Sequence, residues 1–511
     1  MSDNTSNNKR IAKNTLILYF RMFLMMAVSL YTSRVVLKTL GEEDYGIYNV
    51  VGSVVAMFTF VSSAMGNATS RYITYTLGTG NKEKLRSVFN TAFIVHVILA
   101  IFVLILGETI GIWFLNTQMT IPIERLEAAN WVFQCSIVST MVAIINIPFS
   151  AELISHEKMS AFAYLSLLDI FLKLLIVYLI VLSPSDKLIL YAALMLCIYL
   201  LDICVYWIYC KRKFPETKLF FIWDKRLIQD MIGFAGWSLI GNMIWIGYSQ
   251  GLNILLNIFC GPTVNAARGI AFQVQGAVKG FVTNFQMAVN PQITKAYAQG
   301  NLDRVRELIF SSSKISFILV LFPALPIMIE AKKILNIWLV DVPEHTVSFV
   351  ILTLLMLLYT PLENPIGTAN NATGRIKKYQ IITGSFNIFI VVLSYICLKI
   401  GYPPESVFIV QLGIVAIVQF VKAYIVHIQI HFSMSDYILK LFLPLVLVSL
   451  LSASIPLCIR SFITNNIISI FVTVPLCVLC ICLFSYTIAL NKTERTIIHN
   501  QISKVLKAKR S

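Results

Sequence analysis

The chain has 511 residues, of which 57% are hydrophobic and 13% are charged, and its formal net charge is +16. A soluble globular protein carries about 25% charged residues, so this composition excludes a soluble enzyme. Apolar runs of roughly 20 residues recur along the whole chain, and each is long enough to cross a bilayer as a helix. We therefore predict an all-α polytopic membrane protein.

The apolar runs, taken in chain order, predict about 14 transmembrane helices. They cover residues 14–38, 47–70, 88–108, 129–150, 160–182, 188–210, 234–259, 264–290, 309–329, 346–366, 379–399, 406–427, 437–459 and 466–490. The first run is too long for a cleavable signal peptide. With the N-terminus in the cytoplasm, most Lys and Arg residues fall on inner segments, as the positive-inside rule requires. The basic charge is thus a topology signal, and we predict no nucleic-acid partner.

A short basic segment occurs twice. The stretch YTLGTGNKEKLRSVF (75–89) has a counterpart in YAQGNLDRVRELIF (297–310), with one common offset of 220 residues. The offset pairs Gly80 with Gly300, Asn81 with Asn301, Lys84 with Arg304, and Arg86 with Arg306. A second echo, at an offset of 217, pairs Pro148 and Lys158 with Pro365 and Arg375. We interpret the chain as an internal duplication.

The duplication predicts the domain organisation. Each repeat contains six spans, and an even number of spans gives a parallel repeat about an axis along the membrane normal. Two further helices follow the second repeat. The predicted parts are a cytoplasmic tail (1–13), an N-terminal lobe (14–210), a basic cytoplasmic linker (211–233), a C-terminal lobe (234–430), two extra helices (437–490) and a basic cytoplasmic tail (491–511).

The duplicated segment lies in the inner loop between the second and third spans of each lobe. Two interpretations remain open for it. Its basic side chains would anchor the loop against anionic lipid headgroups, or the loop would form an inner gate that closes during transport.

Polar residues recur along two of the spans. In the eighth span Arg268, Gln275, Lys279 and Gln286 are spaced 7, 4 and 7 residues apart, which places them within a sector of about 40° on a helix. In the seventh span Asn242 and Asn253 belong to a similar stripe. Because polar side chains are costly in lipid, both stripes should face water or hydrogen-bond between helices.

Ionisable residues inside other spans are further candidates. Arg21 and Arg34 lie in the first span, and Asp169 and Lys173 are one turn apart in the fifth. Asp169 and Lys173 form either a structural ion pair or an ion-coupling site. Asp202 and Glu363 are isolated acids by spacing. A cationic cavity between two lobes predicts an anionic substrate, because arginine binds phosphate through two parallel hydrogen bonds.

The ten cysteines do not predict a metal centre. The cluster CVLCIC (477–482) lies in an apolar span without His or acidic neighbours, so we interpret it as packing. We predict no metal site and no cofactor. The acidic stretch EED (42–44) offers a catalytic pair to a membrane glycosyltransferase or polymerase, but the outer loops are short and the duplication favours a transporter. We therefore predict that the protein is not an enzyme.

The start of the chain, NTLILYFRMFLMMAVSLYTSRVVLKTLGEEDYGIYNVV, the loop from Arg71 through GN to LRSVF, and the plan of six, six and two spans resemble the Wzx-type O-antigen flippases. These form the polysaccharide branch of the multidrug/oligosaccharidyl-lipid/polysaccharide (MOP) exporter superfamily. The resemblance implies a MATE-like, V-shaped fold of two lobes that alternate between inward-open and outward-open forms. It also implies a bacterial plasma membrane, with both termini in the cytoplasm.

For function, the resemblance implies transfer of an undecaprenyl-diphosphate-linked glycan from the cytoplasmic to the outer leaflet. Arg21, Arg34, Arg268 and Lys279 would hold the diphosphate. Membrane lipids and the polymerase and glycosyltransferases of the same pathway are the other expected partners. A lipid II-type flippase, which shares the fourteen-span plan, and a cation-coupled MATE-like exporter of amphiphilic small molecules are the alternatives.

Overall fold

A computed structural model of the chain describes residues 2–57, 60–117, 119, 121–220, 224–339, 342–460, 463, 466–491 and 494–496. The side chains of some helical residues, Arg34 among them, lie outside this description. Within the described residues the chain forms helices joined by short turns, without a β-strand. Eleven of the described helices are long and apolar enough to cross a membrane. The chain is an all-α multi-pass membrane protein, as its composition predicts.

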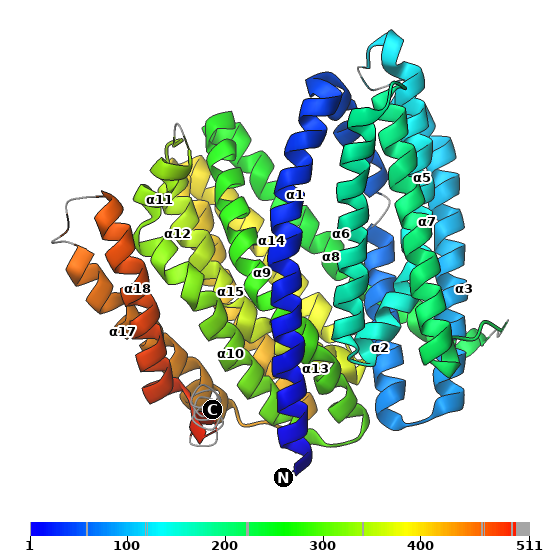
Figure 1. Cartoon of the computed structure of the whole chain (residues 1–511). Helices are drawn as coiled ribbons and strands as arrows, with labels where there is room; N and C mark the ends of the chain where they lie inside the picture. Colours follow the sequence, from blue (N-terminus) through cyan, green and yellow to red (C-terminus); the bar gives the residue numbers. More distant parts are fainter. Residues whose placement is uncertain are drawn as a thin grey trace, which may run out of the picture. The chain divides into compact units, whose positions relative to one another are not determined.

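The helices follow the predicted spans in chain order (Figure 1). The first seven are α1 (Ser2–Met57), α2 (Phe60–Thr79), α3 (Lys82–Leu106), α4 (Ile112–Thr117), α5 (Leu126–Ser155), α6 (Met159–Leu182) and α7 (Lys187–Lys213). The next six are α8 (Lys225–Cys260), α9 (Pro262–Ala298), α10 (Leu302–Ile329), α11 (Ala331–Trp338), α12 (Thr346–Leu357) and α13 (Thr360–Thr373). The last are α14 (Lys377–Ile400), α15 (Glu405–Ile430), α16 (Met434–Asp436), α17 (Leu443–Arg460) and α18 (Asn466–Phe484).

Several helices are longer than the spans predicted for them. The predicted spans 234–259 and 264–290 correspond to α8 and α9, which begin earlier or end later. The reason is that an apolar run marks only the part of a helix that lies in lipid, whereas the helix continues into the polar interface. α1 consists of two helical segments joined by a kink at Gly41, where φ is 82° and ψ is 171°. It therefore contains the first predicted span and the start of the second.

The duplicated loop has the same local geometry in both copies. Gly80 and Gly300 both adopt φ of 73°, a left-handed conformation that glycine takes without a steric penalty. Asn81 then caps α3 by accepting the N–H of Lys84 at 2.9 Å, and Asn301 caps α10 by accepting the N–H of Arg304 at 3.0 Å. Such a cap stabilises a helix by about 1 kcal/mol. The repeat in sequence is therefore also a repeat in backbone conformation.

Internal packing divides the chain into two compact units. The first unit comprises Met1–Asn242 and Thr294–Gly300, and the second comprises Met243–Ile293 and Asn301–Ser511.

In the first unit α5 packs against α7, α3, α2 and α1. A short π-helix, η1 (Gly107–Gly111), follows α3 and lies against α5. Two glycines permit this approach, since a Cβ on Gly107 would lie 2.4 Å from Cδ1 of Ile137 and one on Gly111 would lie 2.5 Å from Cζ of Phe133. Ile137 and Phe133 are fully buried in the same apolar cluster.

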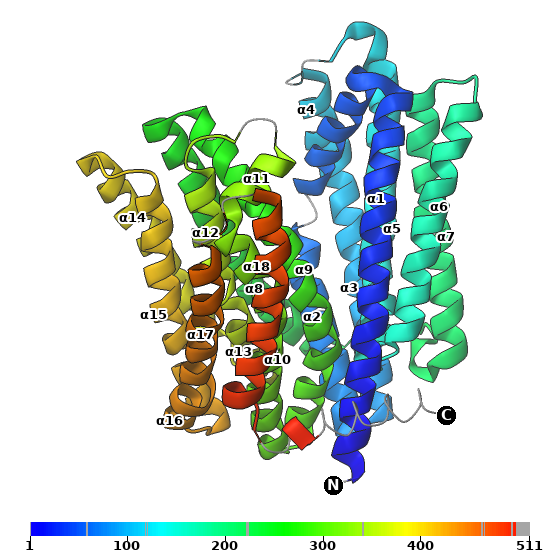
Figure 2. The same ribbon diagram turned by 60° about the vertical axis from the view of Figure 1, so that its left-hand side comes forward.

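In the second unit the core lies among α9, α10, α12, α14 and α15, where the rings of Phe349 and Phe408 are 4.3 Å apart. The two extra helices, α17 and α18, lie side by side (Figure 2) and both pack against α10. A buried carboxylate fastens them. Glu330, at the end of α10, accepts hydrogen bonds from Ser469 at 2.7 Å and Thr473 at 3.0 Å, both on α18.

Candidate functional site

Arg21 of α1 contacts two other helices of the first unit. Its Nη1 donates to Oγ of Ser166 at 3.1 Å, and its guanidinium carbon lies 4.8 Å from the ring centre of Phe162, both on α6. Tyr206 of α7 interacts with it electrostatically. The structure thus places this cation among hydroxyl groups and aromatic rings. The side chain of Arg34, the other predicted cation of the first span, lies outside the described residues.

Asp169 and Lys173 form the ion pair that their spacing predicts, with Nζ 2.8 Å from the carboxylate. Asp202 of α7, an isolated acid by sequence spacing, lies within hydrogen-bonding reach of Asp169. Two carboxyl groups therefore share one ammonium group, and a proton or a cation would balance the remaining charge. Nζ of Lys173 is 5.7 Å from the ring centre of Tyr199. The pair is compatible with both a structural role and an ion-coupling role.

In the second unit Arg268 of α9 is held by neutral groups. Its Nη1 donates to Oδ1 of Asn253 at 3.1 Å, and its Nη2 donates to the carbonyl of Ser249 at 3.0 Å. The guanidinium carbon also lies 4.5 Å from the ring centre of Phe272. Among the described residues no carboxylate forms an ion pair with it. The structure thus brings Arg268 and Asn253 together, and no carboxylate among the described residues is paired with the arginine.

The other members of the two predicted stripes have different surroundings. Lys279 is exposed near the middle of α9, and the part of the chain that the structure describes offers it no ion-pair partner. Gln275 donates to the carbonyl of Thr353 on α12 at 3.2 Å. Gln286 is buried, and its Nε2 has no hydrogen-bond partner among the described residues. Asn242 is half-buried on α8.

Glu363 also has a partner that sequence spacing does not reveal. Its carboxylate forms an ion pair with Lys422 of α15. Tyr248 of α8 interacts electrostatically with both Glu363 and Arg268. An arginine, a tyrosine and a Glu–Lys pair thus form one polar network inside the second unit.

A cavity of about 400 Å³ lies within the first unit and was not predicted from the sequence. Its walls come from α1, α2, α5 and α7. Hydroxyl groups recur among the lining residues: Tyr48, Ser62, Ser136, Ser139, Thr140 and Tyr199. No charged side chain lines it among the described residues. Ser139 and Thr140 follow Ser136 by three and four residues, and this spacing is the sequence signal that places each of them on the same helix face as Ser136.

The two copies of the duplicated arginine hold equivalent parts of the fold. Arg86 of α3 lies with its guanidinium carbon 3.6 Å from the ring centre of Phe220, in the segment that follows α7. Arg306 of α10 donates through Nε and Nη2 to the carbonyl of Ile430, the last residue of α15, at 3.2 and 3.1 Å. Because α7 and α15 correspond to the sixth spans of the two predicted repeats, each arginine contacts the segment at the end of such a span.

The remaining basic members of the duplicated loop differ in exposure. Lys84 is exposed, and Arg304 pairs with Glu307 at 2.7 Å. These contacts lie within one unit each. The headgroup-anchor and gate interpretations of the loop both remain predictions.

The acidic stretch EED (42–44), the candidate catalytic pair of the enzyme alternative, contains an aspartate, Asp44, that binds an arginine. Asp44 receives two hydrogen bonds from Arg125, at 2.8 and 2.6 Å, and the same guanidinium pairs with Asp186 at 2.6 Å. Asp186 also caps α7 through the N–H groups of Leu188 and Ile189. The hydrogen bond from Arg125 lowers the pKa of Asp186, with burial opposing it and the cap adding to it. The side chains of residues 42 and 43 lie outside the description.

The sequence profile of the MatE family matches residues 18–179, which is less than half of the chain. None of the curated proteins matches. Solved structures match over most of the chain. A MATE protein in the bent conformation has a TM-score of 0.72 at 15% identity, covering 83% of this chain and 96% of that protein.

The fold is that of the MATE transporters. An outward-facing multidrug resistance MATE family transporter of the MOP superfamily has a TM-score of 0.70 at 16% identity, covering 83% of this chain and 96% of its own. A MOP superfamily transporter from Pyrococcus furiosus has a TM-score of 0.69 at 16% identity, with 82% of this chain and 96% of that one covered. The latter is described as having a binding pocket of reverse polarity that suggests a different function. Pocket polarity thus differs among proteins with this fold.

Proposed function

We propose that the protein is a flippase that moves a polyprenyl-diphosphate-linked oligosaccharide from the cytoplasmic to the outer leaflet by alternating access. The glycan would be a repeat unit of an O-antigen, a capsule or an exopolysaccharide. The MATE fold supports a membrane exporter, and the cations of the spans support an anionic cargo.

The main support for this proposal is the exposed position of Lys279 near the middle of α9. Lys279 stands 17 residues after the start of α9 and 19 before its end, and it lies 11 residues, or about 16 Å, before the end of the predicted span 264–290. A lysine stem is too short to reach the interface from there. Because a charged group exposed to the bilayer core is costly, an exposed lysine at this depth favours a water-filled face.

Arg268 supports a phosphate group as the feature that is recognised. It lies 11 residues before Lys279 on α9, so the two side chains are about 20° apart around the helix and about 16 Å apart along it. Its charge is held by neutral partners, which leaves it available to a diphosphate. Arginine offers two parallel donors to such a group, and lysine adds a point charge.

The glycan part of the cargo would be bound by neutral polar groups. The cavity of the first unit is lined by hydroxyl side chains, which hydrogen-bond to sugars without a charge requirement. The polyprenyl tail would remain in the lipid. A polymerase and the glycosyltransferases of the same pathway are the proposed partners, and a bacterial plasma membrane with both termini in the cytoplasm is the proposed location.

A cation-coupled exporter of amphiphilic small molecules is the second candidate. The similarity to MATE transporters and the cluster of Asp169, Lys173 and Asp202 favour it, because two carboxyls that share one ammonium provide a site for a proton or a cation. A lipid II-type flippase differs from the first proposal only in the glycan.

The test is transport by the purified protein in liposomes. A fluorescent undecaprenyl-diphosphate oligosaccharide would be followed by its protection from a membrane-impermeant quencher. Arg268→Ala and Lys279→Ala should abolish flipping, whereas Arg268→Lys should retain part of it because the charge is kept. Lys440→Ala is the matched control, since Lys440 is an exposed cation 69% accessible to solvent.

Flipping at the wild-type rate by well-folded Arg268→Ala and Lys279→Ala variants would overturn the cation-binding role. Absence of flipping by the wild type, combined with gradient-driven export of an amphiphilic dye, would replace the flippase proposal by the exporter. A lipid II analogue as the only transported cargo would select the remaining alternative.

A further inference from the structure

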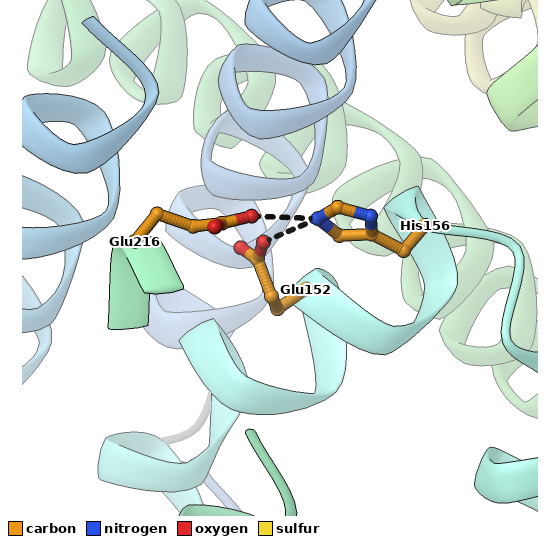
Figure 3. Close-up of side chains that lie close together, drawn as sticks. All are labelled: Glu152, His156 and Glu216. Atoms are coloured by element: carbon orange, nitrogen blue, oxygen red, sulfur yellow. Dashed lines mark hydrogen bonds and ion pairs between the residues drawn. The ribbon is translucent and has the colours of Figure 1, made fainter. Parts of the chain in front are cut away.

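Three potential metal ligands converge near the end of α5 in the first unit (Figure 3). Glu152 is in the last turn of α5, His156 follows the helix directly, and Glu216 belongs to η3 (Pro215–Thr217), the short helix after α7. Nε2 of His156 lies 2.9 Å from Oε1 of Glu152 and 2.8 Å from Oε1 of Glu216. One ligand atom from each residue falls within 4.8 Å of the others.

The charges of this cluster do not balance without an added proton or cation. Two carboxylates face a single ring nitrogen, which donates at most one hydrogen bond. The side chain of Glu152 is fully buried, and neither of its oxygens receives a donor with hydrogen-bond geometry. Among the described residues no lysine or arginine pairs with Glu152 or Glu216. A buried carboxylate in this situation needs a proton or a positive ion.

The spacing of the ligand atoms suits a metal ion. Two ligands bound at about 2.1 Å and at right angles lie about 3.0 Å apart, close to the distances of 2.8 and 2.9 Å found here. One imidazole and two carboxylates suit borderline divalent ions, of which Zn²⁺ favours the nitrogen and Mn²⁺ the oxygens. The ring of His156 is also held in place, since it stacks on Phe214 with centroids 4.3 Å apart.

We propose that Glu152, His156 and Glu216 form a binding site for one divalent transition-metal ion of the Mn²⁺ or Zn²⁺ type. The expectation from sequence that the chain has no metal site is thereby replaced by a proposal. Spacing did not reveal the site, because Glu216 lies 60 residues from His156 in the chain.

The internal duplication indicates that these ligands are not a requirement of the fold. At the offset of 217 residues, Ala369 stands where the first unit has Glu152, and Thr373 stands where it has His156. The second unit makes the same turn without a carboxylate or an imidazole at those positions. Glu152 and His156 are therefore not repeated in the second unit.

The ion would fasten the segment after α7 to the turn between α5 and α6. Glu157, in the same turn, already contacts two other helices. Its carboxylate forms an ion pair with Lys295 of α9 at 2.9 Å, and its backbone carbonyl accepts a hydrogen bond from the side-chain amide of Asn14 of α1 at 3.4 Å. An occupied site would add the linker to this group of elements. Metal binding would therefore stabilise the first unit at the end that carries the basic linker.

The test is metal binding by the full-length protein, purified in detergent and stripped with a chelator. Free Mn²⁺ would be measured by electron paramagnetic resonance during titration, and Zn²⁺ would be added as a competitor. We expect one Mn²⁺ per chain, displaced by Zn²⁺, with affinity at least about tenfold weaker in Glu216→Gln and in His156→Ala.

A second histidine–glutamate pair provides the matched control. Nδ1 of His345 lies 2.6 Å from Glu405, and the side chain of His345 is as exposed as that of His156. Glu344 is 4.0 Å from the other ring nitrogen, but among the described residues these three do not bring one ligand atom each within 4.8 Å of the others. His345→Ala should bind Mn²⁺ as the wild type does. Absence of Mn²⁺ and Zn²⁺ binding by the wild type at millimolar concentration would overturn the proposal, as would unchanged affinity in Glu216→Gln, which preserves the shape of the side chain.

Discussion

Removal of the Glu330 carboxylate should release the two C-terminal helices from the second unit. The side chain is fully buried, and Oε2 lies 3.2 Å from Nζ of Lys333 and 3.7 Å from Nε of Arg460. Its hydrogen bonds to Ser469 and Thr473 join α10 to α18. Burial alone would raise the pKa of Glu330, but these hydroxyls and Lys333 lower it overall, so the group is ionised.

The magnitude follows from what the Glu330→Ala variant leaves behind. Two buried hydroxyls lose their acceptor, and two cations lose their counter-charge, a change that typically destabilises by about 3–5 kcal/mol. At about 2–4 °C per kcal/mol, the apparent unfolding temperature should fall by roughly 6 °C or more. Glu330→Gln should lose less, because its amide oxygen still accepts from the two hydroxyls.

The assay is thermal unfolding in detergent followed by intrinsic fluorescence, together with limited proteolysis between α15 and α18. Glu344→Ala is the control, because Glu344 is 87% exposed in the same unit. Protease sensitivity of the last helices should rise in Glu330→Ala before the rest of the chain is cleaved. Equal unfolding temperatures for Glu330→Ala and Glu344→Ala would refute the reasoning.

Substitutions at three further residues test other parts of the structure. The pKa of Asp186 is lower in the folded protein than its ordinary value of about 3.8. The ionised side chain therefore stabilises the fold at any pH above this ordinary pKa, and this stabilisation is lost as the pH falls through the pKa of the folded state. The difference in unfolding temperature between wild type and Asp186→Asn should therefore shrink on acidification towards pH 3; a constant difference would contradict this. Gly78→Ala should destabilise by about 1–3 kcal/mol in thermal unfolding, because the new Cβ would lie 2.9 Å from the carbonyl of Lys295. Gly300→Ala should lower the free energy of unfolding by about 1–2 kcal/mol because of the positive φ at this position; nothing lies within 4 Å of the new Cβ, so a steric clash is not the cause. Gly300→Asn should destabilise less, because asparagine tolerates this conformation better than alanine. A larger loss in Gly300→Asn than in Gly300→Ala would exclude backbone strain as the cause.

The helices and the repeated turn at Gly80 and Gly300 could be predicted from the sequence because both are local properties. A run of about 20 apolar residues has few stable alternatives to a helix in lipid. The repeated glycine and asparagine are a turn and a helix cap written in adjacent residues, so Gly80 with Asn81 and Gly300 with Asn301 adopt the same conformation in both copies. The pair of Asp169 and Lys173 was predictable for the same reason, since one helical turn joins them.

The partners of the other charged residues were decided by the tertiary structure alone. Asp202 and Glu363 are isolated by spacing, yet one lies beside Asp169 and the other pairs with Lys422, 59 residues away. The cluster at His156 likewise joins α5 to a segment beyond α7. Hydrophobic periodicity specifies which residues enter the membrane, but any of several helix rotations satisfies it. Close packing, such as that permitted by the glycines of η1, selects one rotation and so determines which charges meet.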